Sequence, residues 1–433
     1  MQDMHNHATK IITQIISENM PDKAVKEALQ AYSLPDKLYL VAIGKAAWTM
    51  TKAACDYLGD KIHKGVAITK YGHSQGEIFP VAIYEAGHPI PDDNSIKATE
   101  AVLDLVSNLG AEDTVLFLVS GGGSALFESP KDGVTLDDLQ SLTKILLEKG
   151  AAITEINALR KRLSKVKAGG FAEICKPASI FSIVLSDVLE DRLDTIASGP
   201  AAPDMTTRED ALRIAKKYKV DEMFLHSDTN TADRVMTSKD KTPITLLFRQ
   251  ETPKSTDNVK TVIVGSVRSL CKSAADCAKS LGYTPYVLTT SLGCEAAEAG
   301  KVLAAIARDT QAGLSHFRKP CAIIMGGETI VHVKGNGKGG RNQEMALAAA
   351  KGIAGLANTI VFALGSDGTD GPTDAAGGIV NGDTLANLTA QGLSIDSILA
   401  NNDSYNGLKA VDGLIITGPT GTNVNDVAVL LCV

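Results

Sequence analysis

The residues of this chain that could do chemistry gather first in a glycine-rich run near residue 340. The run GNGKGG is followed at once by RNQE, and it carries two cations, Lys338 and Arg341. Glycines leave backbone amides accessible to a ligand, and neighbouring cations favour an anion, so the run predicts an anion site, most often for phosphate. We expect ETIVHV to form a strand before it and Arg341 to open a helix whose dipole also favours anions. The residues assigned to this site are Gly335, Gly337, Lys338, Gly339, Gly340 and Arg341.

A second glycine-rich run, VSGGGSAL, follows a buried-strand pattern. Its glycines let backbone approach a phosphate or carboxylate and its serines offer hydroxyl donors; the alternative is a tight turn without a ligand. Lys45 follows the apolar run LYLVAI at an expected helix start, where a cation opposes the helix dipole unless an anion is bound. The alternative there is a solvated lysine. The candidate residues of this group are Lys45, Ser120, Gly121, Gly122, Gly123 and Ser124.

Acidic residues form a third group. GSDGTDGPTDAAGG follows the apolar run TIVFALG and contains Asp367, Asp370 and Asp374. Such carboxylates can hold a hard divalent cation, or one can serve as a base. Alternatively, each closes an Asx turn. Asp187, after the run SIFSIVL, and Glu328, before the glycine run, are further candidates for metal binding or base catalysis.

Two segments keep two interpretations each. NALRKRLSKVKAGG places Arg160, Lys161 and Lys167 on a helix that ends in glycines, where they either bind an anion or only compensate the helix dipole. GHPIPDDNS contains His88 beside prolines, and a catalytic and a structural histidine fit that loop equally well.

Three familiar motifs are incomplete. Leu126 stands where a nucleophile elbow requires glycine, and Ala46 stands where a Walker A loop requires serine or threonine. GNGKGG satisfies GxGxxG, but the acidic residue expected about 20 residues later falls in an apolar run. The sequence therefore disfavours a serine hydrolase and a P-loop protein, and it supports a dinucleotide site only weakly.

Composition limits the remaining classes. The 433 residues carry a net charge of −7 without a long basic block, which argues against a nucleic-acid partner. The seven cysteines are scattered and show no CxxC spacing, so they predict neither a disulfide framework nor a zinc site. Neither a signal peptide nor a membrane-spanning apolar run is apparent. We therefore expect a cytoplasmic protein without a membrane partner.

Apolar runs alternate with amphipathic stretches along the chain, which predicts an α/β fold with two domains, each a mainly parallel sheet flanked by helices. Strands predicted at 38–43, 114–120 and 179–188 end at the candidate residues, as ligand sites of α/β sheets require. The polar segment 238–260 marks a boundary, so we expect domains at 1–238 and 250–433 with an active-site cleft between them.

Ordered strings along nearly the whole chain carry a family resemblance. They are IGKAA, GHPIPDDNS, SGGGSAL, LRKRLSKVKAGG, LSDV with IASGPAAPD, GGETIV with GKGGRNQE, GSDGTDGPTDAAG, NNDSY and TGPTGTNVND. The set resembles the glycerate 2-kinase family, whose C-terminal region is called the MOFRL domain and some of whose members are labelled hydroxypyruvate reductase. The resemblance implies a Rossmann-like domain within 1–238 and a MOFRL region within 250–433.

The resemblance also implies an activity, namely transfer of the ATP γ-phosphoryl group to the 2-hydroxyl of D-glycerate, with Mg²⁺ or another divalent cation. It associates Lys45 and Arg341 with catalysis, and we expect them to neutralise charge on the phosphoryl group and on the substrate carboxylate. The chain departs from the family pattern in two segments: Leu189 and Glu190 replace Pro-Gly after LSDV, and Lys338 replaces an arginine. An NAD(P)H-dependent hydroxypyruvate reductase and a non-catalytic sensor of phosphorylated metabolites stay open as alternatives.

Overall fold

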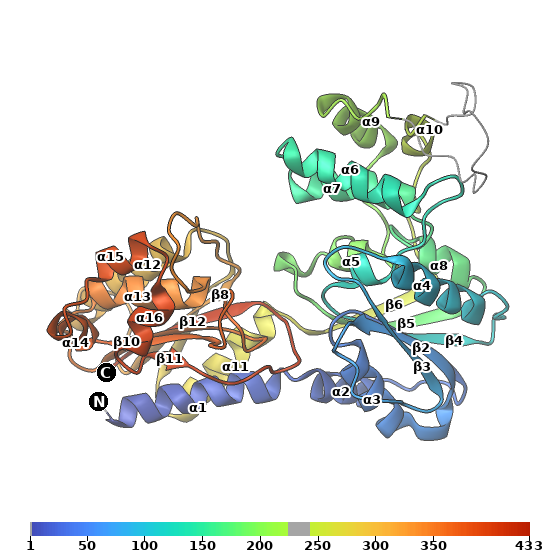
Figure 1. Cartoon of the computed structure of the whole chain (residues 1–433). Coiled ribbons are helices and arrows are strands. Elements are labelled where there is room, and N and C mark those ends of the chain that lie inside the picture. Colours follow the sequence, from blue (N-terminus) through green and yellow to red (C-terminus); the bar gives the residue numbers. More distant parts are fainter. Residues whose placement is uncertain (1, 224–242) are drawn as a thin grey trace. The chain divides into compact units, whose positions relative to one another are not determined.

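The computed structural model describes residues 2–223 and 243–433, which form two compact units with one six-stranded sheet each (Figure 1). The β1–β6 unit comprises Val25–Val184 and Arg192–Val264, and the β7–β12 unit comprises Met1–Ala24, Leu185–Asp191 and Gly265–Val433. The expected boundary at residue 238 lies outside the described residues. The last passage of the chain between the units falls at residues 264 and 265, because the polar segment before it leads into a strand of the first sheet.

The sheet of the β1–β6 unit has the order β3-β2-β1-β4-β5-β6, and the pairs β2–β3, β1–β2, β1–β4 and β4–β5 are parallel, as predicted. Its strands are β1 (Leu38–Ile43), β2 (Ile62–Lys70), β3 (Val81–Ala86), β4 (Thr114–Val119), β5 (Ser179–Leu185) and β6 (Val259–Gly265). From β1 the strands are added in one direction as β2 and β3 and in the other direction as β4, β5 and β6, so the order of addition reverses between β1 and β4. The carboxyl ends of these two strands therefore border the crevice at which open α/β sheets bind ligands.

Helices of this unit cover the sheet and also form a separate lobe (Figure 1). Those near the sheet are α2 (Pro21–Ala31), α3 (Ala47–Leu58), α4 (Asp93–Val106), α5 (Gly123–Leu126) and α8 (Gly170–Cys175), with short 3-10 turns at Gly59–Lys61 and Ile196–Ser198. The lobe contains α6 (Leu136–Glu148), α7 (Ile153–Arg160), the 3-10 turn Lys161–Leu163, α9 (Arg208–Lys217) and α10 (Thr245–Phe248). It has its own apolar core, to which Leu142, Leu159 and Ile214 belong.

The second sheet corrects one sequence prediction. Its order is β11-β10-β9-β12-β8-β7, and only β7–β8 is parallel among the described pairs, whereas β8–β12, β12–β9, β9–β10 and β10–β11 are antiparallel. Its strands are β7 (Thr284–Leu292), β8 (Cys321–Gly327), β9 (Thr359–Gly365), β10 (Gly377–Asn381), β11 (Leu414–Ile415) and β12 (Asp426–Cys432). The α/β class is confirmed, but a mainly parallel sheet is wrong here. β8, β9 and β12 are buried throughout, so their apolar runs do not reveal strand direction.

The helices of the β7–β12 unit are α1 (Gln2–Glu18), α11 (Val267–Ser280), α12 (Ala296–Gln311), α13 (Arg341–Gly352), α14 (Thr384–Ala390), α15 (Ile395–Ala400) and α16 (Ser404–Lys409), with a 3-10 turn at Leu189–Asp191. α1 packs on α11, and α12 packs on α13 (Figure 1). α1 buries Met4, Ala8, Ile11 and Ile15, which is the spacing of an amphipathic helix.

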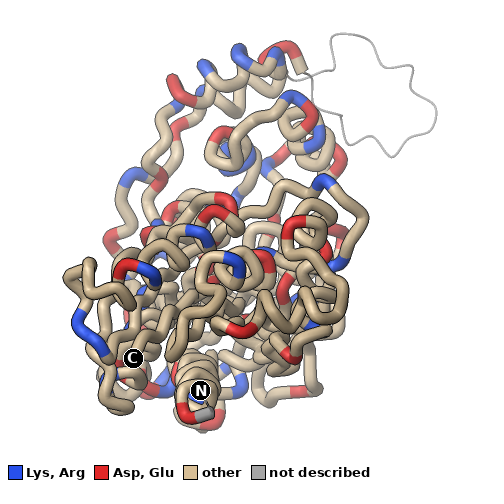
Figure 2. Tube along the Cα trace, turned by 90° about the vertical axis from the view of Figure 1, so that its left-hand side faces the viewer, with Lys and Arg blue, Asp and Glu red and all other residues tan. Residues whose placement is uncertain are grey.

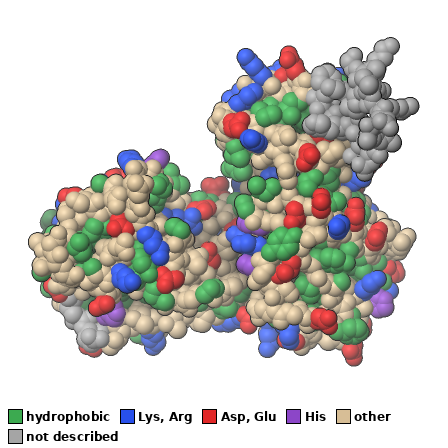
Figure 3. Space-filling view, viewed as in Figure 1, with side chains coloured by type: hydrophobic (Ala, Val, Ile, Leu, Met, Phe, Trp, Pro, Cys, Tyr) green, Lys and Arg blue, Asp and Glu red, His purple; other side chains and the backbone are tan. Residues whose placement is uncertain are grey.

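The surface shows no single dominant feature in the two views drawn. Charges of both signs are mixed along the helices in Figure 2, and exposed hydrophobic side chains form small groups among charged ones in Figure 3. Within residues 2–223 and 243–433, no helix is long and apolar enough to cross a membrane.

Candidate active site

The candidate residues of the β1–β6 unit meet where β1 and β4 end. The Ser120 amide donates to the Ile43 carbonyl at 3.0 Å, and the Lys45 amide donates to the Gly121 carbonyl at 2.8 Å. The Ser120 hydroxyl accepts from the Ala46 amide at 3.1 Å and donates to the Ile43 carbonyl at 3.2 Å. Ser120 therefore ties the two strand ends together, and its hydroxyl is not the free donor that the sequence predicts.

Lys45 lies against the glycine turn without a charged partner. Its side chain is half-buried, and no acidic group of the described residues pairs with its ammonium. A Cβ atom at Gly122 would lie 3.3 Å from Lys45 Cγ and 3.0 Å from His88 Cδ2, and Gly122 has a φ of 88°. Only glycine therefore lets both side chains approach the turn in this conformation.

His88 lies beside Lys45 at this turn. The imidazole is half-buried, and burial, followed by the charges of Lys45, Lys70 and His73, lowers the pKa of His88 to about 4. His88 is consequently neutral near pH 7, where it can accept a hydrogen bond. A neutral imidazole beside unpaired cations suits an anionic ligand that carries a hydroxyl group.

The turn continues through Ser124 into α5. The Ser124 and Ser198 hydroxyls lie 2.8 Å apart, and both Ala197 and Ser198 adopt positive φ values, 50° and 63°. Such conformations are costly for non-glycine residues and concentrate at functional sites. The Lys167 ammonium supports the turn by donating to the carbonyls of Ser124 and Phe127 at 2.8 and 2.9 Å. Lys167 is therefore a buried structural cation.

The glycine run of the β7–β12 unit sits in an irregular loop. β8 ends at Gly327, and ETIVHV, predicted to be a strand, contains only an isolated bridge at Ile330. The predicted arrangement of strand, glycine loop and helix is therefore wrong in its first part. The loop conformation is instead imposed by a distant segment, Asn401–Asp403, which packs so closely that a Cβ at Gly335 or Gly337 would overlap it.

That distant segment also occupies the loop amides. The amides of Lys334 and Gly335 donate to Asn402 Oδ1 at 2.7 and 3.0 Å. The Asn336 amide donates to Asn401 Oδ1 at 3.1 Å, the Gly337 amide donates to the Asn401 carbonyl at 2.9 Å, and the Lys338 amide donates to Asp403 Oδ1 at 2.9 Å. The amides of Gly339 and Gly340 have no acceptor among the residues described. The Lys338 side chain is exposed, and its ammonium lies 4.2 Å from the centre of the Tyr405 ring. Most of the predicted anion cradle is thus filled by protein.

Asp370 takes the position that the sequence assigns to a ligand at the start of α13. Its carboxylate accepts from the amides of Asn342 and Gln343 at 3.2 and 2.8 Å. Asp370 is 3% exposed, and burial raises its pKa. The helix dipole is therefore compensated by an internal carboxylate.

Arg341 is paired with two carboxylates of its own unit. Its Nε and Nη2 donate to Asp426 at 2.5 and 3.1 Å, and its Nη1 donates to Glu328 at 2.9 Å. Burial raises the pKa of Asp426 to about 6, while Arg341 acts in the opposite direction. Burial also disfavours the guanidinium charge, but Asp426 and then Glu328 raise the pKa of Arg341. Carboxylates of the protein therefore already compensate the cation that opens α13.

The remaining acidic candidates serve separate contacts. Asp367 accepts from the Thr369 amide at 3.0 Å as an Asx turn, Asp374 accepts from the Tyr405 hydroxyl at 2.7 Å, and Asp187 is half-buried after β5. Within residues 2–223 and 243–433, no three His, Cys, Asp or Glu side chains are grouped as metal ligands. The Asp370 carboxylate accepts hydrogen bonds from backbone amides, and the Asp426 carboxylate accepts hydrogen bonds from Arg341. These residues do not fit a resident metal site.

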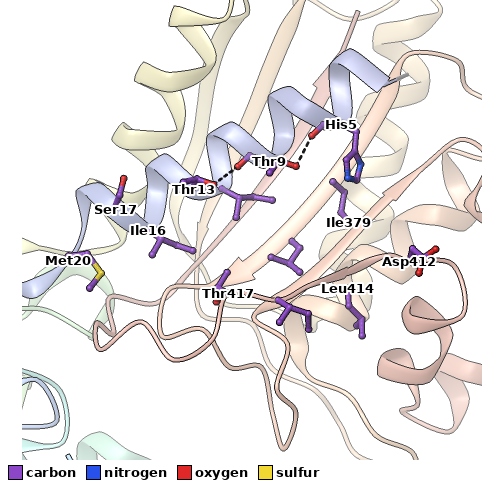
Figure 4. A pocket seen from close by; sticks show the side chains of 13 residues that line it. His5, Thr9, Thr13, Ile16, Ser17, Met20, Ile379, Asp412, Leu414 and Thr417 are labelled. Atoms are coloured by element: carbon purple, nitrogen blue, oxygen red, sulfur yellow. Dashed lines mark hydrogen bonds between the residues drawn. The ribbon is translucent and has the colours of Figure 1, made fainter. Parts of the chain in front are cut away.

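A pocket of about 580 Å³ lies between α1 and the β10–β11 edge of the same unit (Figure 4). Its lining is mostly apolar or hydroxyl-bearing, as the Thr9, Thr13 and Ile16 side chains in Figure 4 illustrate. The lining contains neither a lysine nor an arginine nor any candidate residue. We therefore do not assign the anion site to this pocket.

The sequence does not predict the roles of several residues of these sites, because the groups that they contact are distant in sequence. Asp426 lies 85 positions from Arg341, and Asp403 lies 65 positions from Lys338. The available signal is that Asp403 and Asp426, like Ser198 and His88, fall within strings that carry the family resemblance. Local pattern alone does not assign roles to them.

Comparisons with known proteins agree with that resemblance. Residues 7–229 match the family described as a domain of unknown function (DUF4147), and residues 321–426 match the MOFRL family. The D-glycerate 2-kinase of Thermotoga maritima is 52% identical over 426 residues, 98% of either chain. A putative hydroxypyruvate reductase of Agrobacterium vitis is 37% identical over 90% of this chain and 98% of its own length.

A solved structure is similar over the full length. The crystal structure of glycerate kinase from Thermotoga maritima has a TM-score of 0.93 at 51% identity, and the match covers 100% of both chains. Identity at this level over whole chains leaves no segment of the fold unmatched. The chain therefore belongs to the glycerate 2-kinase family.

Proposed function

We propose that this protein is an ATP-dependent glycerate 2-kinase, which transfers the γ-phosphoryl group of ATP to the 2-hydroxyl of D-glycerate and releases 2-phosphoglycerate. Membership of the family supports the reaction. The observation that carries the site assignment is the Lys45 side chain, which lies beside Gly122 and His88 and whose ammonium has no acidic partner among the described residues. Phosphoryl transfer depends mainly on positioning and charge neutralisation, and this cluster offers both at the ligand crevice of the sheet.

In this proposal Lys45 and the amides of Gly121–Ser124 neutralise charge on the transferring phosphoryl group. Arg341 acts as a second catalytic cation, and Asp426 holds it in place through two hydrogen bonds. The Glu328 side chain is 47% exposed, and an exposed ion pair contributes little free energy. A substrate anion can therefore replace Glu328 on Arg341 without disturbing Asp426. The nearby Lys338, Gly339 and Gly340 then contribute charge and free amides.

We assign the divalent cation, Mg²⁺ or another, to the ATP phosphates rather than to a protein cage. Mg²⁺ often binds substrate phosphates with only one or two carboxylates, so the lack of fit described above does not conflict with Mg-ATP as the donor. Asp187, Asp367 and Asp374 remain the candidates for such a carboxylate. The proposal includes a cytoplasmic location and small-molecule partners, D-glycerate and ATP, without nucleic acid or membrane.

An NAD(P)H-dependent hydroxypyruvate reductase is the weaker alternative. The name of the Agrobacterium vitis relative favours it. However, GNGKGG does not follow a strand directly, and Asn401–Asp403 occupies most of the amides that a pyrophosphate would need.

Two parallel assays test the proposal. Purified protein with D-glycerate and Mg-ATP should consume ATP and form a product that enolase converts directly, as only 2-phosphoglycerate allows. The same protein with hydroxypyruvate and NADH should leave NADH unchanged, and the Lys45→Ala variant controls for contaminating kinase. A product that enolase accepts only after a mutase is added, or NADH oxidation without ATP turnover, would overturn the assignment.

A further inference from the structure

The basic segment 160–167, which begins with the last residue of α7, contains one cation that differs from the others in its ion pairing. The segment carries five cations, and four of them have acidic partners. The pairs are Lys161 with Asp194 and Asp204 at 3.6 and 3.3 Å, Arg162 with Asp204 and Glu251 at 3.5 and 3.3 Å, Lys165 with Asp132 at 2.7 Å and Lys167 with Glu128 at 3.1 Å. The fifth cation, Arg160, has no acidic partner among the residues described.

Arg160 is also left with a buried donor. The side chain is half-buried, and its Nε atom is fully buried and has no hydrogen-bond partner in the described part of the chain. A buried donor without a partner is costly, more so on a charged group, and native proteins rarely keep one without a reason. An anionic ligand would satisfy both the charge and the donor.

The backbone pairs the segment after Arg160 with the segment that follows the glycine turn and α5. Three to five residues after Arg160, the chain pairs with that segment through Lys131 N to Leu163 O at 2.8 Å and Lys165 N to Ser129 O at 2.7 Å. Burial, and then the positive charge of Arg160, lower the pKa of Lys167, against the effect of Glu128. The Lys167 ammonium in turn contacts the Ser124 carbonyl.

We infer that Arg160 binds the carboxylate of the D-glycerate substrate. The inference rests on the proposed kinase function and assigns its substrate subsite. A planar guanidinium matches a planar carboxylate through paired hydrogen bonds, whereas the compact Lys45 ammonium suits a phosphoryl group. The carboxylate and the 2-hydroxyl of D-glycerate sit on adjacent carbons, so their binding groups must be close together. In this assignment Lys45 at Gly122 and Arg160, whose charge acts on the Lys167 that contacts Ser124, bind neighbouring groups of one substrate.

The Arg160→Met variant tests whether Arg160 acts in substrate binding, measured as KM, or in folding, measured as melting temperature. Loss of a charge-assisted bidentate contact should raise KM for D-glycerate by about tenfold to a hundredfold, with KM for ATP unchanged. The melting temperature should not fall, because the change removes an unsatisfied buried donor. The Lys165→Met variant is the matched control, since Lys165 and its partner Asp132 are 41% and 96% exposed; its KM values should match those of the wild type.

Chemical rescue gives a second, independent measurement. Added guanidinium ion should restore D-glycerate turnover in Arg160→Ala, whereas the turnover of Lys165→Met and of the wild type, which have lost no guanidinium at this site, should not increase. A KM for D-glycerate within about threefold of wild type in Arg160→Met, or a rise in KM for ATP instead, contradicts the inference. A fall of several degrees in melting temperature also contradicts it by revealing a structural role. The wild-type kinase assay is unaffected by these outcomes, so the proposed function stands or fails separately.

Discussion

The two glycine-rich loops of this protein look alike in sequence and differ in how their polar groups are satisfied. In the loop before α13, protein side chains occupy most of the amides, Asp370 occupies the helix start, and Asp426 pairs with Arg341. At the Ser120–Ser124 turn, Lys45 has no charged partner among the described residues, and His88 is kept neutral. The first loop is largely complete without a ligand, whereas the second leaves charge uncompensated.

The difference shows that glycines and cations in a loop do not by themselves define an anion site. Close approach of protein backbone requires glycine as much as close approach of a ligand does, as Gly337 against Asn401 illustrates. What marks the turn after β4 is its position at the reversal of strand order together with Lys45, which has no acidic partner among the described residues. The predictions below test this contrast between the two loops.

The largest expected effect is on Lys45. Lys45→Ala should lower kcat by about a hundredfold or more, because a cation directed at transition-state charge is lost. Its melting temperature should stay within a few degrees of wild type, since no protein partner loses a contact. Lys52→Ala, which removes an exposed lysine of α3 paired with exposed Asp56, should change neither quantity. If turnover of Lys45→Ala stays within about threefold of wild type, Lys45 does not neutralise transition-state charge as assigned.

Arg341→Ala should lose both turnover and stability, in contrast to Lys45→Ala. Without its partner the buried Asp426 carboxylate is left uncompensated, which should cost about 2 kcal/mol of unfolding free energy. Without Arg341 the folded-state pKa of Asp426, already raised, rises further above its unfolded value. The destabilisation should therefore be small near pH 5 and grow as pH rises toward about 8.

Thermal unfolding of the double variant Arg341→Ala/Asp426→Asn is the control for this pair. Removing the uncompensated Asp426 charge should recover most of the lost unfolding free energy and abolish the pH dependence of the destabilisation. Equal destabilisation of the single and double variants at all pH values would show that Asp426 does not hold Arg341 as proposed.

Gly122→Ala tests the turn itself against a matched glycine. Gly122 and Gly133 have φ values of 88° and 78°, so alanine should cost each a similar 1 to 2 kcal/mol, on the order expected for left-handed backbone. Only Gly122→Ala places a methyl group against His88 and Lys45, because nothing lies within 4 Å of a Cβ at Gly133. We expect turnover to fall only in Gly122→Ala. Equal turnover in Gly122→Ala and Gly133→Ala would show that the turn at Gly122 has no special part in catalysis.

The smallest effect concerns the His88 imidazole, which NMR can follow directly. The pKa of His88, lowered to about 4, should rise in Lys45→Ala and also when inorganic phosphate binds, since either change reduces the positive field. The resonances of exposed His316 in the other unit should not move. A His88 titration that is insensitive to both changes would place the anion elsewhere.

The sequence predicted the parts of the molecule that depend on local pattern. The strands ending at Ile43 and Val119 were expected from their apolar runs, and their carboxyl ends are where Lys45 and the glycine turn meet. Features that depend on distant pairing were missed or wrong, among them the antiparallel insertion of β12 and the pairing of Asp426 with Arg341. Periodicity reports burial and element type, but it does not report which distant group satisfies a given amide or charge.

The most direct test of the central claim is a crystal structure of the protein with its product, 2-phosphoglycerate. We predict that the phosphate contacts the Lys45 ammonium and the amides of the Gly121–Ser124 turn. We also predict that the carboxylate contacts Arg160. A product bound only through Arg341 and the Gly339–Gly340 amides, without contact to Lys45 or Arg160, would contradict the account.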